Sequence, residues 1–183
     1  VNIISGAGFR HYSGAGWDYS SRPPLTSFYL AGFFTVFGVS VNIARIGMIF
    51  ISSLSIPLIY WFCYKSLKLD KNIAILSSVI WSLYPPSIYY SGLVLTENIA
   101  NILSLLVVIS IVEMIRSGRI WIGLFTGVII GLATLNRPIY LLFVLALPLG
   151  SILFTKKIQF KWRLWAISMV GFILALAPWT IRN

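Results

Sequence analysis

Six long apolar runs separated by short polar loops dominate this chain of 183 residues. Hydrophobic residues make up 58% of it and charged residues only 10%, a balance far from that of soluble globular proteins. A helix crosses the hydrocarbon of a bilayer with about 20 apolar residues and satisfies all its backbone groups internally. The pattern predicts an all-α, polytopic membrane protein. The expected spans are Ile46–Tyr64, Asn72–Ser91, Asn98–Ile115, Ile120–Asn136, Ile139–Thr155 and Leu164–Ile181.

The basic residues predict how these spans are oriented. Lys and Arg outnumber Asp and Glu by 14 to 4. The bases do not form the clustered soluble face of a nucleic-acid-binding protein, so nucleic acid is not expected as a partner. Instead they gather in the alternate loops KSLKLDK, RSGR and KKIQFKWR, which the positive-inside rule makes cytoplasmic. The intervening turns and the N-terminal stretch are then non-cytoplasmic.

Residues 1–45 are expected to form an external loop, and residues 46–183 to complete a single membrane domain. The apolar run Leu25–Phe37 has only 13 residues, too few to cross hydrocarbon. Pro23 and Pro24 fit a helix start, so a surface helix is predicted over residues 23–38. Val1 is not an initiator and the chain stops directly after an apolar run, so we expect a piece of a longer protein.

Glu97 is the only charged residue among the 41 that lie between Lys71 and Glu113. A carboxylate in such an apolar context costs several kcal/mol unless it lies at the membrane surface, lines a wet cavity or has a partner. Glu97 is therefore a candidate functional acid at the outer end of a helical hairpin. Its structural alternative is a helix-start residue that interacts with the helix dipole, beside a possible Thr96 cap.

Arginines on the outward face are not explained by the positive-inside rule. They would suit an anionic group such as a phosphate or pyrophosphate at headgroup level. The structural alternative is that individual arginines merely extend to the interface from helix ends. The five outward arginines are Arg10, Arg22, Arg45, Arg137 and Arg182.

Six segments occur in an order and spacing that resemble a known family. They are SGAGF, SSRPPLTSFYLAGFFTVFG, NIARIG, LYPPSIYYSGLVLTEN, GLATLNRP and APWTIRN. Together they resemble the membrane part of bacterial and archaeal glycosyltransferases related to the dolichyl-phosphate-mannose protein mannosyltransferases, the family 39 group. The resemblance covers nearly the whole chain.

The resemblance implies a C-type glycosyltransferase fold, a helical membrane bundle whose first external loop carries surface helices. It implies transfer of a sugar from a polyprenyl-phosphate donor to a protein, lipid or glycan on the non-cytoplasmic side of the plasma (inner) membrane. The family's catalytic aspartate would fall upstream of Val1. Asp18, four residues before Arg22, is a candidate substitute, with a solvated loop acid or turn former as the alternative.

Inverting transfer from a lipid phosphate requires a carboxylate to deprotonate the acceptor and cations to stabilise the departing phosphate. Glu97 and Asp18 are thus the candidate catalytic acids. Arg22, Arg137 and Arg182 are the candidates that bind the donor phosphate. His11, Asp18 and Glu97 do not form a metal-ligand signature. No cofactor is certain, and a divalent cation remains open.

A transporter or flippase for a lipid-linked or anionic solute is the alternative function. In it, Glu97 would couple transport and a helix break at Tyr84–Pro86 would form the site. This alternative predicts charges near the middle of the membrane, whereas Glu97, Arg137 and Arg182 all fall at predicted helix ends. A purely structural membrane subunit would leave the outward arginines unexplained.

Overall fold

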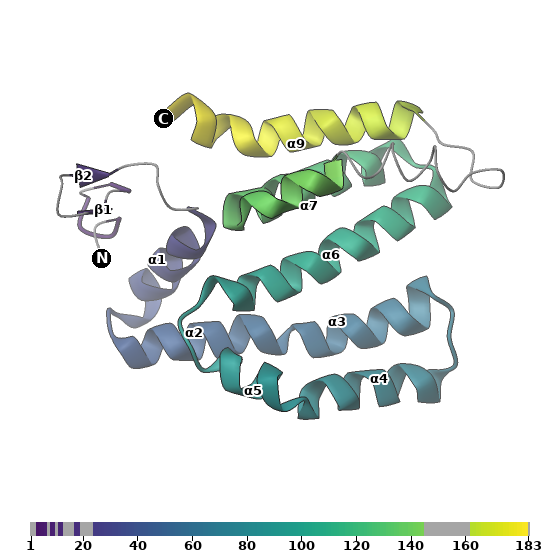
Figure 1. The fold of residues 1–183 in the computed structure, drawn as a ribbon, viewed down its shortest axis with the longest axis horizontal. Coiled ribbons are helices and arrows are strands. Elements are labelled where there is room, and N and C mark those ends of the chain that lie inside the picture. Colours follow the sequence, from purple (N-terminus) through teal and green to yellow (C-terminus); the bar gives the residue numbers. More distant parts are fainter. Residues whose placement is uncertain are drawn as a thin grey trace. The chain divides into compact units, whose positions relative to one another are not determined.

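The computed structural model describes residues 3–6, 8–9, 11–12, 17–18, 24–144 and 162–182. Its contacts divide the chain into two compact units, residues 1–102 with 183 and residues 103–182. Both units are built from helices, shown in Figure 1. The predicted all-helical fold class is confirmed, with one addition. A two-residue strand β1 (His11–Tyr12) pairs antiparallel with β2 (Trp17–Asp18), too short for sequence alternation to predict.

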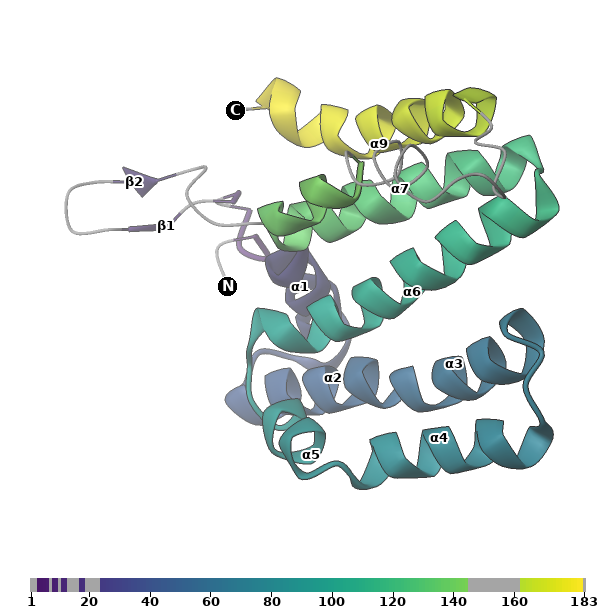
Figure 2. The same ribbon diagram turned by 45° about the vertical axis from the view of Figure 1, so that its right-hand side comes forward.

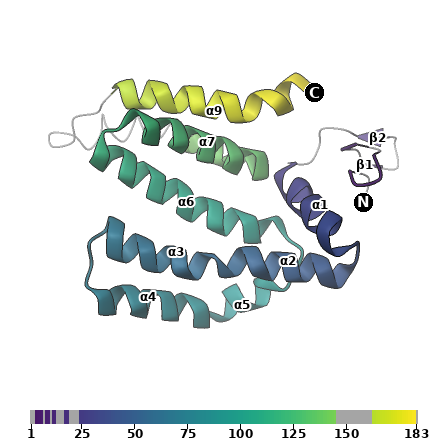
Figure 3. The same cartoon turned by 180° about the vertical axis from the view of Figure 1, so that it is seen from behind.

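A helical hairpin forms the centre of the first unit. Its first arm comprises α2 (Val41–Ser53), α3 (Ser55–Trp61) and the π-helical η1 (Phe62–Ser66). Its second arm comprises α4 (Lys71–Leu83) and α5 (Pro85–Ser91). The arms lie side by side and antiparallel (Figures 1 and 3), with α4 packed on α3 and α5 packed on α2. The tips of α2 and α5 therefore share one end of this unit.

Side-chain caps define where the two arms begin. The Ser40 hydroxyl accepts a hydrogen bond of 3.1 Å from the Ile43 backbone N–H, and the Asp70 carboxylate accepts one of 2.8 Å from Asn72. Such caps satisfy backbone donors that have no partner within the helix. α2 consequently begins at Val41, five residues before the predicted span. The prediction started too late because Arg45 ended the uncharged run, yet an exposed arginine is accommodated within the second turn of the helix.

The second arm breaks at Tyr84, as the two prolines after it predicted. Tyr84 is extended, with φ −68° and ψ 112°, and Pro85 opens α5 at its first position. A residue before proline is excluded from the helical region by the proline ring, while proline itself is favoured at a helix start. The predicted span Asn72–Ser91 is thus two helices joined at a fixed bend.

A helix, α1 (Leu25–Phe37), forms where the surface helix was predicted, and its location at the membrane surface stays a prediction. It leaves α2 at a clear angle (Figure 3). The Tyr29 hydroxyl donates a 2.6 Å hydrogen bond to the carbonyl of Gly47, and partial burial of the phenol raises its pKa. The Phe33 ring lies so close to Gly47 that an added Cβ would come within 3.1 Å of it. α1 is therefore anchored on α2, whichever way it meets the membrane.

The second unit contains most of α6 (Thr96–Ser117) together with α7 (Ile120–Asn136), the 3-10 turn η2 (Pro138–Tyr140) and α9 (Trp162–Arg182). α7 and α9 lie side by side in every view (Figures 1 and 2). Glycines on α7 meet residues that advance along α9 in the same order: Gly123 beside Leu164, Gly127 beside Ser168, and Gly131 beside Phe172. The two helices consequently run parallel and pack backbone against backbone.

Three helical stretches in the described residues are long and apolar enough to cross a membrane: Val41–Ser66, Thr96–Ser117 and Trp162–Arg182. Three shorter apolar helices accompany them, α1, α4 and α7. The predicted count of six spans is therefore not confirmed. Two reasons are visible, the bend at Tyr84 and the 17 residues of α7. The predicted span Ile139–Thr155 lies largely outside the described residues.

Candidate functional site

Glu97 lies in the first turn of α6, directly after the loop that follows α5. The adjacent Asn98 is 1% exposed, and its side-chain amide donates a 2.8 Å hydrogen bond to the Leu93 carbonyl. The Thr96 hydroxyl donates to a Glu97 carboxylate oxygen over 3.2 Å. Asn98 thereby fixes the loop against the helix start, while Glu97 itself stays half-buried. The geometry also satisfies the helix-dipole alternative, since an acid in the first turn is favoured there.

Arg137 lies between α7 and η2 in an extended conformation, with φ −150° and ψ 123°. Its backbone N–H donates to Ala133 over 2.8 Å, and its carbonyl accepts from Tyr140 over 3.2 Å. Pro138 enforces the extended geometry, as at Tyr84. Asn136, directly before Arg137, is completely buried, whereas Arg137 is half-buried. The turn therefore holds the arginine's backbone from both sides at the end of α7.

Arg182 lies in the last turn of α9, with its guanidinium 5.2 Å from the centre of the Trp179 ring. A cation over an indole face is a favourable arrangement. Because α7 and α9 run parallel, Arg137 and Arg182 lie at the same end of the second unit. The contact with Trp179 also fits the structural alternative, in which an arginine at a helix end extends to the interface.

The remaining candidates are placed only in part. Asp18 lies in β2, where its backbone pairs with His11. Arg10 and Arg22 lie outside the described residues. Glu97 and Asp18 belong to the first unit, and Arg137 and Arg182 to the second. The structure thus places Arg137 and Arg182 at the same end of the α7–α9 pair, and the predicted convergence of all the candidates on one site stays a prediction.

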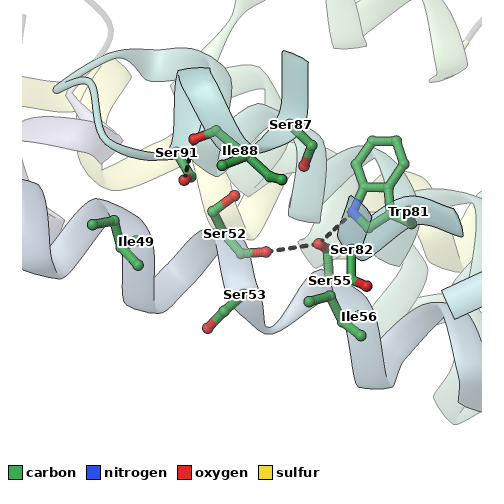
Figure 4. Close-up of a pocket in the computed structure, with 10 residues that line it drawn as sticks. All are labelled: Ile49, Ser52, Ser53, Ser55, Ile56, Trp81, Ser82, Ser87, Ile88 and Ser91. Atoms are coloured by element: carbon green, nitrogen blue, oxygen red, sulfur yellow. Dashed lines mark hydrogen bonds between the residues drawn. The ribbon is translucent and has the colours of Figure 1, made fainter. Parts of the chain in front are cut away.

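A pocket of about 100 Å³ lies between the two arms of the hairpin in the first unit, beside the breaks at Leu54 and Tyr84 (Figure 4). Six of its ten lining residues are serines: Ser52, Ser53, Ser55, Ser82, Ser87 and Ser91. The indole N–H of Trp81 donates to the Ser55 hydroxyl over 2.8 Å, and that hydroxyl donates to the Ser52 carbonyl over 2.7 Å. These two hydrogen bonds connect α4 to α3 across the pocket.

The serines mostly bond to their own helices. Ser53, Ser82 and Ser91 donate to backbone carbonyls three residues earlier, which satisfies polar groups that hydrocarbon cannot. None of the ten lining residues carries a charge. The pocket therefore offers hydrogen bonds, but its lining includes no carboxylate or imidazole to act as a general base and no cation to neutralise a departing phosphate. We interpret it as a polar joint between two broken helices rather than a catalytic centre.

The sequence analysis did not predict this joint or the close packing of α7 on α9. The signals were present, as serines concentrated in two apolar runs and as glycines spaced four apart from Gly123 to Gly131, a pattern typical of closely packed membrane helices. Within the described residues, no group of three or more His, Cys, Asp and Glu is placed to hold a metal ion. The requirement for a divalent cation stays open.

Comparison with known proteins gives one significant finding. Residues 21–181 match the model of the family described as dolichyl-phosphate-mannose-protein mannosyltransferase. No curated protein and no solved structure matches the chain significantly. The family match spans α1, both arms of the hairpin and the α7–α9 pair as far as Ile181, and so includes Glu97 and Arg137 but neither Asp18 nor Arg182. The resemblance seen in the sequence is confirmed, and the chain belongs to the dolichyl-phosphate-mannose-protein mannosyltransferase family of membrane glycosyltransferases.

Proposed function

We propose that this protein transfers a sugar from a polyprenyl-phosphate donor to a protein, lipid or glycan on the non-cytoplasmic side of the membrane. The family match over residues 21–181 is the observation that carries this proposal. The family's own description names a lipid-phosphate-linked mannose as donor and a protein as acceptor. We extend to this chain the class of donor, a sugar on a lipid phosphate, and leave the sugar and the acceptor open.

Specific residues take the roles that this chemistry requires. Glu97 acts at the outer end of the hairpin, either by orienting the base or by deprotonating the acceptor. Arg137 and Arg182, at one end of the α7–α9 pair, bind the donor phosphate and stabilise it as it departs. Arg22 and Asp18 complete the proposed set from the external loop. A divalent cation, if the reaction uses one, would assist the same phosphate.

The parallel arrangement of α7 and α9 supports the proposed topology. If both helices cross the bilayer in the same direction, the chain between them has to cross back an odd number of times. The apolar run Ile139–Thr155 supplies one such crossing by length and composition. Arg137 and Arg182 then face the same side of the membrane, which is the non-cytoplasmic side in the proposal.

Replacing Glu97 by glutamine tests the proposed function. We expect Glu97→Gln to reduce transfer of labelled mannose from polyprenyl-phosphate mannose at least tenfold in membranes containing the protein, because general acid-base catalysis contributes about 10²- to 10⁴-fold. Glutamine has nearly the same shape as glutamate and retains an oxygen that can accept the hydrogen bond from Thr96. The substitution therefore tests the loss of the negative charge alone.

Glu113→Gln is the matched control, because it removes an acid from the other end of the same helix. We expect this variant to transfer the sugar at the normal rate. Equal rates for wild type and Glu97→Gln would contradict the role of Glu97. A protein that moved the lipid-linked sugar across the bilayer without any transfer would instead support the transporter alternative.

Cysteine labelling tests the topology, in a background in which Cys63, the single cysteine, is replaced by serine. Leu67 and Val94 are suitable sites because they are 46% and 42% exposed, whereas the more polar Ser66 is only 2% exposed. We expect an impermeant reagent to label Val94→Cys in intact cells and Leu67→Cys only after permeabilisation. The opposite result would show that the protein is inverted and would remove the basis for an outward site.

A further inference from the structure

Tyr140 is a buried tyrosine whose hydroxyl bonds to another helix, next to a residue of the proposed site. Its side chain is 6% exposed, and its hydroxyl lies 2.5 Å from the Ser104 hydroxyl of α6, 36 residues away in sequence. Its ring stacks on Phe143 with centroids 5.9 Å apart. Both partners belong to the second unit. This bond joins α6 to the turn that carries Arg137.

The turn around Arg137 is anchored on both sides of the arginine. Asn136 precedes it and is completely buried, and Tyr140 follows three residues later and is also buried. Pro138 and Ile139, between them, are exposed. The Tyr140 backbone N–H donates to the Arg137 carbonyl, so a displacement of Tyr140 is transmitted directly to the backbone of the arginine.

We propose that Tyr140 and Ser104 are positioning residues for Arg137, holding it at a fixed place relative to α6. This inference rests on the proposed function, in which Arg137 binds the donor phosphate. A charged hydrogen bond to phosphate depends strongly on geometry because the guanidinium is a planar fork. The tyrosine and serine need not touch the donor. They determine the position from which the Arg137 guanidinium reaches the donor phosphate.

Binding of polyprenyl phosphate, with the uncharged polyprenol of equal length as reference, tests the inference. Tyr140→Phe removes only the hydroxyl, and Ser104→Ala removes its partner. We expect each to weaken binding of the phosphate by about 2- to 12-fold, the usual range for one hydrogen bond, and to leave binding of polyprenol unchanged. The double variant should bind the phosphate no more weakly than either single variant. Ser104→Thr keeps a hydroxyl at position 104 and should therefore prefer phosphate over polyprenol as the wild type does.

A second comparison separates positioning from mere stabilisation. In an Arg137→Ala background, Tyr140→Phe should have no further effect on phosphate binding, since the residue through which it acts is gone. Tyr29→Phe is the matched control, because it also removes a tyrosine hydroxyl bond between two helices, in the first unit. We expect this control to bind both lipids normally.

Three outcomes would overturn the inference. If Tyr140→Phe weakened binding of phosphate and polyprenol equally, the bond would serve stability alone. If it weakened phosphate binding to the same extent with and without Arg137, it would act through another group. If Arg137→Ala left the preference for phosphate intact, the role of Arg137 in the proposed function would fail, and this inference with it. The first two results leave that role standing, so the failures are distinguishable.

Discussion

Gly127→Ala is expected to destabilise the protein by about 3 kcal/mol, the upper part of the range for overpacking, and to lower Tm by roughly 6 to 12 °C. A Cβ at Gly127 would overlap the backbone carbonyl of Ser168 and lie 2.8 Å from the Phe172 nitrogen. Backbone cannot move aside as a flexible side chain can, so the two helices would have to separate. Van der Waals packing, which small residues strengthen by letting backbones approach closely, is one of the forces that hold membrane helices together.

Gly32→Ala is the control, measured by thermal unfolding in the same detergent. Gly32 is also in a helix, and no heavy atom lies within 4 Å of a Cβ built there. Alanine is a better helix former than glycine by about 1 kcal/mol, so this variant should be neutral or slightly stabilised. The difference between the two variants then measures packing alone. Equal unfolding temperatures would show that α7 and α9 do not pack as closely as described.

The sequence predicted those features that depend on local chemistry. The ends of α1, α6 and α7 fall within two residues of the predicted boundaries because prolines, glycines and charged loops interrupt the apolar runs there. The bend at Tyr84 followed from Pro85 and Pro86, whose rings exclude a continuous helix. The family was recognisable because six short motifs keep their order along the chain.

Features that depend on pairing between helices were not predictable in the same way. Which face of α7 meets α9 is decided by the residues of both helices together, and a run hydrophobic on all sides shows no preferred face. The same applies to the contact between Tyr140 and Ser104, which joins residues 36 positions apart. Likewise, the pocket exists because the hairpin places two helix breaks side by side, of which only the one at Tyr84 was predicted and the one at Leu54 was not.

The candidate site also combines features that follow from local sequence with features that depend on contacts in the folded chain. The turns that carry Glu97 and Arg137 were identified from single residues, since a lone acid, or an arginine in a turn predicted to be non-cytoplasmic, is conspicuous in an apolar chain. The contact between the Arg182 guanidinium and the Trp179 ring depends on the helical last turn of α9, because a helix brings residues three positions apart next to each other. The sequence therefore identified the candidate residues, whereas the contacts around each of them could be described only from the folded structure.

Arg137→Ala is expected to lower the efficiency of sugar transfer by about 10- to 150-fold, equivalent to the ~1.5 to 3 kcal/mol of a charged hydrogen bond. The substitution leaves the turn intact, because the two backbone bonds of residue 137 do not involve its side chain and Pro138 still enforces the extended conformation. Arg137→Lys should recover part of the activity, since a lysine supplies the charge without the planar fork.

Arg119→Ala provides the matched control at the other end of α7, where an exposed arginine precedes the first residue of the helix. Both variants remove one positive charge from the same helix, so a general electrostatic effect would appear in both. Transfer of labelled mannose from polyprenyl-phosphate mannose is measured at several donor concentrations. If Arg137 binds the phosphate before reaction, KM rises; if it stabilises the departing phosphate, kcat falls. Equal loss in the Arg119 variant would assign the effect to net charge and remove Arg137 from the site.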